Sequence, residues 1–437
     1  MPEKNDPGKK PGEKRQFINE KIVKQPLTKR QIAKRLLALF FIAVLFGVIA
    51  AISFALSRPW AVRYLGNEPE TQESSISIPK DDITEVPQEP AESESTLQET
   101  EPVEEIIQSA MEKYSYSIEN LNSMYGVLRE AAQEANKGIV LVHSVQQDTD
   151  WFDNPVETSG LYAGAVIAST RRELLILTPG AAVSEADSIK VTFDDGTEVG
   201  GRIKQKDQTS GMAVVSVNID EVDESTWKTV DTLPLGNSYT MKQGDLVIAV
   251  GSPAGIVNSI DYGYVSYIMN NAQVTDGVRR ALFTSAAADT EMGTFLVNIH
   301  GELIGWATQE FQSNGSDQIA EVMGISDYKW ILERMSNGLA APYFGVSGQE
   351  VTEEMVNRGL PQGLYVQTSV ADGPAYNAGI QNGDIITMID DKEITSMKDF
   401  MGALENLNSE QLVNVTVQRK GRDTYTQLQF QMTIGTR

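Results

Sequence analysis

The chain carries one long apolar run near its N-terminus. Residues 36–56, LLALFFIAVLFGVIAAISFAL, contain no charged side chain. A helix rises about 1.5 Å per residue, so this run would span about 30 Å, the thickness of the hydrocarbon core of a bilayer. A cleavable signal peptide would have a shorter apolar core and a small-x-small cleavage site, and the SRPW that follows is no such site. The pattern predicts a retained transmembrane helix.

Polar residues dominate the next stretch, residues 57–105. From residue 68 to residue 105 acidic residues and prolines are frequent, whereas large apolar residues are few. A segment of this composition cannot bury enough apolar surface to offset the entropy that is lost on ordering. We therefore expect an acidic, extended and disordered linker.

A heptad pattern follows in residues 106–135. Its apolar positions alternate at spacings of four and three, at Ile107, Met111, Tyr114, Ile118, Leu121, Tyr125 and Leu128. This spacing is typical of an amphipathic helix. We favour a helix that lies on the following domain; the alternative is a short coiled coil that holds several copies of the chain together.

Short apolar runs separated by Gly, Asp and Asn turns fill residues 136–338. GIVLVHSV, ELLILT and MAVVSV form a first set, and GDLVIAVG, YGYVSYIM and TFLVNIHGELIGWAT form a second. Such spacing predicts a mainly β fold with two barrels of about equal size. Residues 341–437 differ, because strand patterns such as GLYVQTSV alternate with helix patterns such as SMKDFMGALENL. They predict a compact α+β module, with the boundary at residues 338–342.

Charge is unevenly distributed along the chain. The 437 residues include 36 basic and 60 acidic side chains, for a net charge of -24, which argues against a nucleic-acid partner. Residues 1–35 are nevertheless a basic tail, which places the N-terminus in the cytoplasm by the positive-inside rule. We expect a single-pass membrane protein whose C-terminal domains are extracytoplasmic. Because the sequence has no cysteine, these domains contain no disulfide.

Metal and cofactor chemistry finds no support in the sequence. His and Cys do not cluster at ligand spacing, and neither a GxGxxG nor a P-loop pattern is present. The acidic pairs Asp194-Asp195 and Asp390-Asp391 offer oxygen ligands for Ca²⁺, but both fit hairpin turns better. We expect no metal and no cofactor.

Three motifs give the chain a family likeness over residues 138–437. QGDLVIAVGSPAG is similar to GDxVxAIGNPxG, VNIHGELIGWAT to LVNxxGxVIGINT, and PAYNAGIQNGDIITMIDDKEI to SPAxxAGLxxGDxIxxIxGxxI. On these motifs the chain resembles the HtrA (DegP-like) serine proteases. The resemblance implies a membrane helix, a trypsin-like double β-barrel at residues 136–338, a PDZ domain at residues 341–437, and a homo-oligomer, a trimer in the family.

The resemblance fails at the catalytic positions. The family's His stands in a stretch like ILTNNHVV, which here is ILTPGAAV and has Ala181 in its place. The Asp of TDLAVLKI corresponds to Gly211, and the Ser of GNSGGPLVN corresponds to Met292 or Gly293. Peptide cleavage by this chemistry needs a nucleophile, a base and an orienting carboxylate. The three positions therefore predict a degenerate triad, and Glu291 near the oxyanion position would repel a developing negative charge.

Other side chains offer no replacement for the triad. His143 lies in a strand pattern and His300 in a turn pattern, both far from the expected cleft. Ser285 and Thr284 have no Lys nearby. A carboxylate pair between Asp289 and Glu291 fits two solvated acids on a surface loop better than a catalytic dyad.

The PDZ-like module keeps the residues that recognise peptides in such domains. By resemblance Tyr343, Phe344, Gly345 and Val346 form the loop whose N–H groups hold a peptide C-terminus, and the helix at residues 396–404 forms the other wall. The sequence therefore predicts a pseudoprotease that binds peptide C-termini or unfolded proteins as a sensor or chaperone-like scaffold in envelope quality control. The alternatives are an active HtrA-type serine endopeptidase and an oligomeric structural scaffold.

Overall fold

The structure is a computed structural model that describes residues 75–82, 118–149, 155–311, 319–422 and 424–437. These residues belong to one compact unit, Ser74–Arg437. Among them no helix is long and apolar enough to cross a membrane. The basic tail at residues 1–35 and the expected transmembrane helix at residues 36–56 lie outside the described residues, so both stay predictions.

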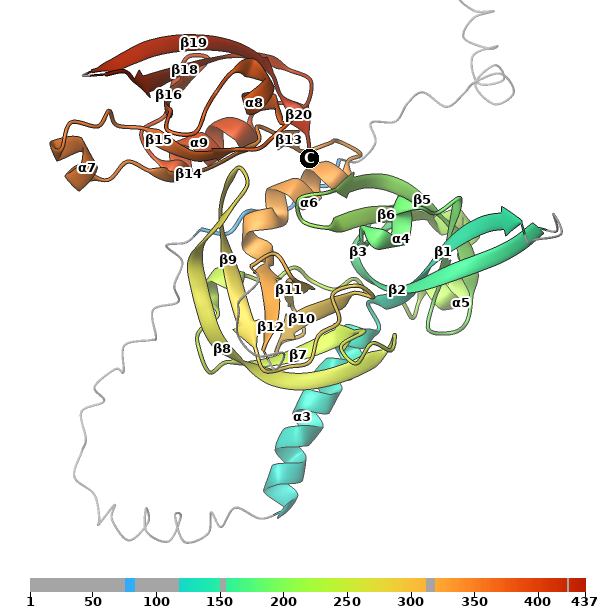
Figure 1. Cartoon of the computed structure of the whole chain (residues 1–437). Helices are drawn as coiled ribbons and strands as arrows, with labels where there is room; N and C mark the ends of the chain where they lie inside the picture. The colour runs from blue at the N-terminus through green and yellow to red at the C-terminus, as the bar shows by residue number, and fades with distance from the viewer. Residues whose placement is uncertain (1–74, 83–117, 150–154, 312–318, 423) are drawn as a thin grey trace, which may run out of the picture. The chain divides into compact units, whose positions relative to one another are not determined.

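The first barrel is closed by six antiparallel strands (Figure 1). Its strand order is β1-β2-β3-β6-β5-β4. Because side chains alternate across each strand, one set fills the barrel with Val, Ile and Leu and the other faces outward. The elements are β1 (Ile139–Thr149), β2 (Pro155–Ser169), β3 (Glu173–Pro179), the short helix α4 (Ala181–Ser184), β4 (Ser188–Thr192), β5 (Glu198–Asp207), β6 (Met212–Asn218), the 3-10 turn η1 (Ile219–Glu221) and α5 (Glu224–Trp227).

The second barrel repeats this architecture. It is also closed, in the order β10-β11-β12-β9-β8-β7, and has its own apolar core. A further cluster joins the two barrels, where Trp306 packs edge-on against Tyr328 at 5.1 Å. The elements are η2 (Ser238–Thr240), β7 (Leu246–Gly251), β8 (Ser259–Val274), β9 (Gly277–Thr284), β10 (Thr294–Asn298), β11 (Leu303–Thr308), β12 (Ala320–Gly324), η3 (Ile325–Tyr328) and α6 (Lys329–Ser336).

The C-terminal module is an antiparallel sheet with helices packed on it. β14 lies at the edge of the order β14-β15-β16-β18-β19, and the core includes Phe344 and Phe400 in an edge-on contact at 5.2 Å. The predicted mainly β fold, a trypsin-like double barrel followed by an α+β PDZ module, is confirmed. The elements are β13 (Pro342–Tyr343), β14 (Val346–Glu350), α7 (Glu353–Asn357), β15 (Leu364–Ser369), α8 (Pro374–Ala378), β16 (Ile385–Ile389), β17 (Lys392–Glu393), α9 (Met397–Glu405), β18 (Leu412–Lys420), β19 (Tyr425–Thr433) and β20 (Gly435–Thr436).

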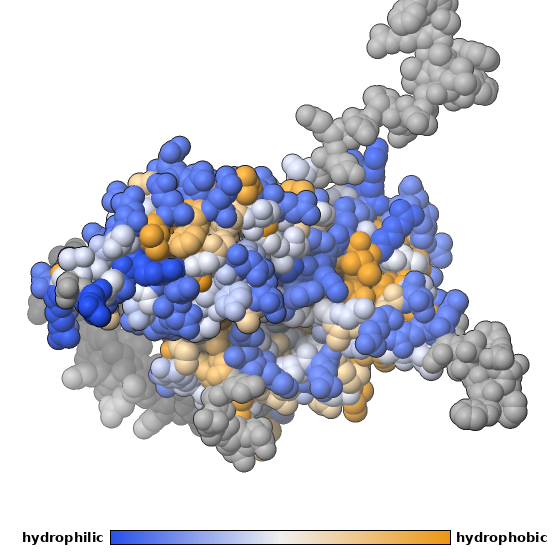
Figure 2. Space-filling view, turned by 45° about the horizontal axis from the view of Figure 1, so that its top comes forward, coloured by the Kyte–Doolittle hydropathy of each residue, from blue (hydrophilic) through white to orange (hydrophobic). Residues whose placement is uncertain are grey.

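The heptad segment forms the helix α3 (Ile118–Asn136), and residues 106–117 lie outside the described residues. Only its C-terminal end packs on the barrels, through Ala132 and Ala135. Ile118, Leu121 and Tyr125 are 78%, 54% and 55% exposed. The favoured expectation, a helix lying on the following domain, therefore fails for the first turns of α3. Elsewhere on the surface, hydrophobic side chains gather in separate patches among hydrophilic ones (Figure 2).

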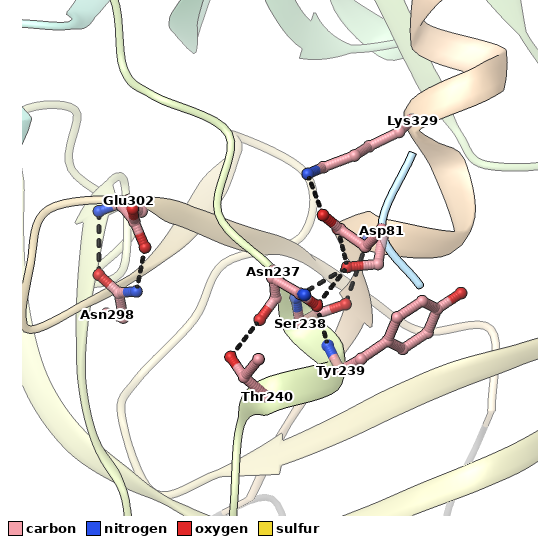
Figure 3. Close-up of polar contacts among 9 residues, drawn as sticks. Asp81, Asn237, Ser238, Tyr239, Thr240, Asn298, Glu302 and Lys329 are labelled. Carbon is pink, nitrogen blue, oxygen red and sulfur yellow. Dashed lines mark hydrogen bonds and ion pairs between the residues drawn. The ribbon is translucent and has the colours of Figure 1, made fainter. Parts of the chain in front are cut away.

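Part of the predicted disordered linker packs on the barrels, because residues 75–82 contact α6 and the residue that follows it. Ile76 exchanges two hydrogen bonds with the Asn337 side chain, and Ile78 is buried. Asp81 forms an ion pair with Lys329 at 2.8 Å and accepts a hydrogen bond from Ser326 at 2.6 Å, next to the Asn237 turn (Figure 3). The remainder of residues 57–105 stays a predicted linker.

A buried ion pair ties the end of β20 to the first barrel. Arg437 Nε donates to Asp207 Oδ1 at 3.1 Å, and both side chains are only 1% exposed. The Arg437 guanidinium also lies 5.9 Å from the centre of the Tyr328 ring. Removing one member of such a pair leaves an uncompensated buried charge, which is strongly destabilising.

We predict that Asp207→Ala lowers the free energy of unfolding by about 3 kcal/mol. The exposed pair Glu354 and Arg358 provides the control, because its side chains are 76% and 73% exposed and Glu354→Ala should cost at most about 0.5 kcal/mol. Urea denaturation followed by tryptophan fluorescence measures both variants. Equal stability of the two variants would contradict the role of the buried pair.

Candidate functional site

Two of the predicted triad positions lie together at the mouth of a cavity. Ala181 begins α4 directly after β3, and Gly211 precedes β6. The Gly180 N–H donates to the Gly211 carbonyl at 2.7 Å, which holds the two loops side by side. Ala181 and Gly211 are exposed and line a cavity of about 790 Å³ together with other residues of the first barrel, among them Ser144, Gln146, Ser159, Tyr162 and Glu185.

The predicted nucleophile position, Met292 or Gly293, lies beside Pro179, the last residue of β3 before Ala181. Gly293 has a φ of +95°, and a Cβ there would lie 2.9 Å from Pro179 Cγ and 3.1 Å from the Ala163 carbonyl oxygen. Met292 precedes it, and its carbonyl accepts a hydrogen bond from the Ala163 N–H at 2.7 Å. Of the two residues predicted at the nucleophile position, only Met292 therefore has room for a side chain.

The histidines lie away from these positions, and the sequence contains only two. His143 Nε2 is 2.9 Å from Thr192 Oγ1, and because Ser144 and Gln146 line the cavity, alternation along β1 puts His143 on the opposite face. His300 is exposed in the turn between β10 and β11. The three positions Ala181, Gly211 and Met292 thus have no imidazole partner.

The loop that precedes Met292 has its backbone donors occupied by Asp289. The N–H groups of Glu291 and Met292 donate to Asp289 Oδ1 at 2.9 and 2.8 Å. Thr294 fixes the loop from the other side, because its hydroxyl donates to the Asp289 carbonyl and accepts from the Asp289 N–H, both at 2.9 Å. Asp289 is half-buried on this surface loop, and the sequence interpretation missed the backbone donors that its carboxylate binds. Its side chain forms an Asx-type turn, a signal that the sequence does contain.

The remaining candidates have structural partners. Thr284 donates its hydroxyl to the Tyr264 carbonyl, and Ser285 Oγ accepts from the Tyr264 N–H, both at 3.1 Å. Asp195 accepts from the Thr226 hydroxyl, which lowers the pKa of that carboxyl, and Asp390 accepts from the Asn414 N–H at 2.8 Å. Within the described residues no group of three or more His, Cys, Asp or Glu is arranged to hold a metal ion.

The predicted peptide-binding loop, Tyr343 to Val346, holds a carboxylate in this structure. The N–H groups of Phe344, Gly345 and Val346 all donate to the side chain of Asp276, at 2.8, 2.8 and 2.9 Å. Gly345 has a φ of +86°, a backbone conformation that turns consecutive N–H groups toward one point. We call these three residues the carboxylate loop. It precedes the edge strand β14 and faces α9 through the Phe344–Phe400 contact.

Asp276 is the residue that the sequence interpretation missed. It lies in the turn between β8 and β9, far from the loop in sequence, and only 2% of it is exposed. Burial raises the pKa of the Asp276 carboxyl, whereas the three N–H donors and Arg437 act in the opposite direction. The Thr-Asp-Gly sequence predicts a turn, but no pattern predicts what its side chain contacts.

Comparison with known proteins separates the chain into the same two modules. Residues 162–305 match the trypsin-like peptidase domain family, and residues 342–429 match the PDZ domain family. The chain is 27% identical over 286 residues to "Serine protease Do-like HtrA" of Lactobacillus helveticus, which covers 61% of this chain and 68% of that protein. It is 28% identical to a "Probable periplasmic serine endoprotease DegP-like" of Pseudomonas fulva, where the match covers 61% of this chain but only 54% of the relative.

Two further comparisons cover more of the sequence and the fold. "Serine endoprotease DegS" of Escherichia coli (strain K12) is 26% identical over 314 residues, 70% of this chain and 84% of that protein. The solved structure "HtrA-type protease AlgW with decapeptide" superposes with a TM-score of 0.51 at 20% identity, over 71% of this chain and 98% of the other. At that identity the superposition shows the shared fold. The chain therefore joins a trypsin-like peptidase domain to a PDZ domain, and over both it is similar to HtrA-type serine proteases.

Proposed function

We propose that this protein is a membrane-anchored, extracytoplasmic HtrA-family pseudoprotease that binds the C-termini of peptides or unfolded proteins. The observation that carries the proposal is the carboxylate loop, in which three backbone N–H groups hold one carboxylate, while the described wall of the cavity beside Ala181 and Gly211 contains no histidine. Such a protein would act as a sensor or chaperone-like scaffold in envelope quality control.

The absence of a histidine favours binding over cleavage. Trypsin-like serine peptidase chemistry requires a histidine within hydrogen-bond reach of the nucleophile. Ala181, Gly211 and Met292 supply neither base, orienting carboxylate nor hydroxyl, and His143 is engaged with Thr192. The active endopeptidase alternative would require a second set of catalytic groups, and the described part of the cavity wall contains no histidine.

The loop around Asp289 removes a second requirement for cleavage. An oxyanion is stabilised by N–H groups that point at it in advance. The N–H groups of Glu291 and Met292 instead donate to Asp289 Oδ1. A tetrahedral intermediate at Met292 would therefore meet a carboxylate that already occupies these donors, so two separate features support an inactive cleft.

The membrane anchor rests on the sequence. The uncharged run at residues 36–56 and the basic tail before it fit a single-pass protein with a cytoplasmic N-terminus. The relatives are bacterial proteins, and the one from Pseudomonas fulva is described as periplasmic. The AlgW structure was solved with a decapeptide. These likenesses support a bacterial envelope location and a peptide ligand.

The first prediction concerns cleavage and recognition in one sample of the purified protein. We expect no labelling by a fluorophosphonate probe and no cleavage of casein, because no hydroxyl is activated. On an array of peptides, we expect binding to those with a free C-terminal carboxylate and none to the same peptides as amides. Labelling would overturn the pseudoprotease proposal, and a blank array would remove the recognition role.

Restoring the triad alone should not restore cleavage. We predict that the triple variant Ala181→His, Gly211→Asp and Met292→Ser stays below about 1% of the casein turnover of an active family member. Removal of a single oxyanion donor already costs about 10²–10³ in kcat, and Asp289 engages the donors of this loop. Adding Asp289→Gly to the triple variant serves as the comparison. Efficient cleavage by the triple variant without that change would contradict the importance of Asp289.

Self-association is a second role that α3 favours. Ile118, Leu121 and Tyr125 occupy successive seam positions of the heptad pattern and are exposed in this chain, so a second copy could bury them. We predict that Ile118→Asp with Leu121→Asp lowers the mass measured by light scattering without changing the thermal stability of the barrels. Ser123→Asp is the control, since Ser123 is exposed and off the seam. An unchanged mass would refute this role.

A further inference from the structure

The tip of the β8–β9 hairpin fills the space between the carboxylate loop and α9. Asp276 and Gly277 are buried. A Cβ on Gly277 would lie 3.2 Å from Met401 Cγ of α9, and Val278 packs against the core of the PDZ module. Arg279 Nη1 lies 3.9 Å from Met401 Sδ. The second barrel therefore places a turn of its own chain at the end of β14.

The backbone of this turn also pairs with β14. The Asp276 N–H donates to the Val346 carbonyl at 2.7 Å, while the Val346 N–H donates to Asp276 Oδ1 at 2.9 Å. β14 is an edge strand, and a bound peptide joins such an edge through main-chain hydrogen bonds of this kind. Asp276 thus makes both contacts expected of a peptide's last residue, one through its backbone and one through a carboxylate.

Val278 supplies the apolar contact that a peptide's C-terminal side chain would make. It packs against a core that includes Phe344, Val346 and Phe400. A free C-terminus that ends in an apolar residue presents the same two groups, a carboxylate for the N–H donors and a side chain for the adjoining apolar surface. The hairpin tip therefore offers the carboxylate loop the same groups as a peptide with an apolar C-terminal residue.

The turn is built so that this contact costs little conformational strain. Asp276 has a φ of +64°, and Asp is among the residues that tolerate this region. Its buried carboxylate is compensated by three N–H donors, and Arg437 lies near enough to stabilise its charge. Turn geometry and carboxylate binding thus favour the same residue at this position.

We propose that Asp276 is an intramolecular ligand of the carboxylate loop, and that C-terminal peptides bind only when they displace the β8–β9 hairpin. This regulation rests on the proposed function, since it concerns the same peptide-binding loop. The three donors cannot serve Asp276 and a peptide carboxylate together, so the two occupants exclude each other. The apparent affinity of the protein for a peptide is then reduced by the fraction of molecules in which the loop is open.

The test uses the full-length protein in detergent and fluorescein-labelled decapeptides that end in Val, each as the free acid and as the amide. Asp276→Asn keeps an acceptor oxygen but removes the charge. We expect this variant to bind the free-acid peptides at least about ten-fold more tightly than the parent protein. Asp245→Asn is the matched control, because Asp245 also accepts a backbone hydrogen bond, from Lys242 at 2.7 Å in the same barrel, and it should leave the affinity unchanged.

The outcomes separate this inference from the proposed function. If no variant distinguishes the free acid from the amide, recognition of C-termini is refuted. If the parent protein and Asp276→Asn bind the free acid equally well, recognition stands and the role of Asp276 is refuted.

Hydrogen exchange on the parent protein gives a second readout that needs no variant. We expect the amides of Phe344, Gly345 and Val346 to be protected both without and with peptide, because one carboxylate replaces the other. The amide of Asp276 should exchange faster once peptide is bound, since it loses the Val346 carbonyl. Unchanged exchange of the Asp276 amide at saturating peptide would overturn the displacement of the hairpin.

Discussion

Backbone N–H groups that converge on one point require an acceptor there, and this requirement shapes both candidate sites. A buried donor without a partner costs about 1–3 kcal/mol. In the carboxylate loop three donors converge, and in the loop before Met292 two donors converge. The chain satisfies each set with one of its own carboxylates, Asp276 and Asp289. Both loops therefore keep their shape without a ligand, but they keep it by occupying the donors that an anionic ligand would use.

The two carboxylates act with different reach. Asp289 lies two and three residues before the N–H groups that it binds, so its contact is local and closes within one turn. Asp276 reaches a different module, and its position depends on β8 and β9, which pair along their length within a closed barrel. Arg279 and Arg437 stack on the same Tyr328 ring close by. The contact between the second barrel and the PDZ module is thus supported by the paired strands β8 and β9 and by the buried arginines Arg279 and Arg437.

The sequence predicted the architecture well, since the signals for it are local. Alternating apolar positions and Gly turns define both barrels, and a heptad pattern marks α3. Contacts between distant segments left no such signal. In the sequence, Ile76 and Ile78 belong to a polar segment with no pattern of its own. Only the structure shows that their N–H groups donate to the side chains of Asn337 and Glu333. The carboxylate loop was predicted by its resemblance to PDZ domains, but its partner Asp276 lies 68 to 70 residues away along the chain, so only the folded structure brings the two together.

The exposure of the predicted triad positions shows why the fold does not depend on catalytic side chains there. Ala181 and Gly211 are exposed at the cavity, while the residues that follow them are buried, Ala182 in the core of the first barrel and Met212 in the cluster between the barrels. Stability depends on the buried neighbours, because the cost of a substitution rises with the apolar volume removed from the core. A catalytic side chain at an exposed position contributes little packing, so its absence leaves the barrel intact. The carboxylate loop is the opposite case, since its backbone is buried and bonded. The fold of the barrels therefore does not depend on a catalytic triad, and the same fold holds the hairpin that contacts the carboxylate loop.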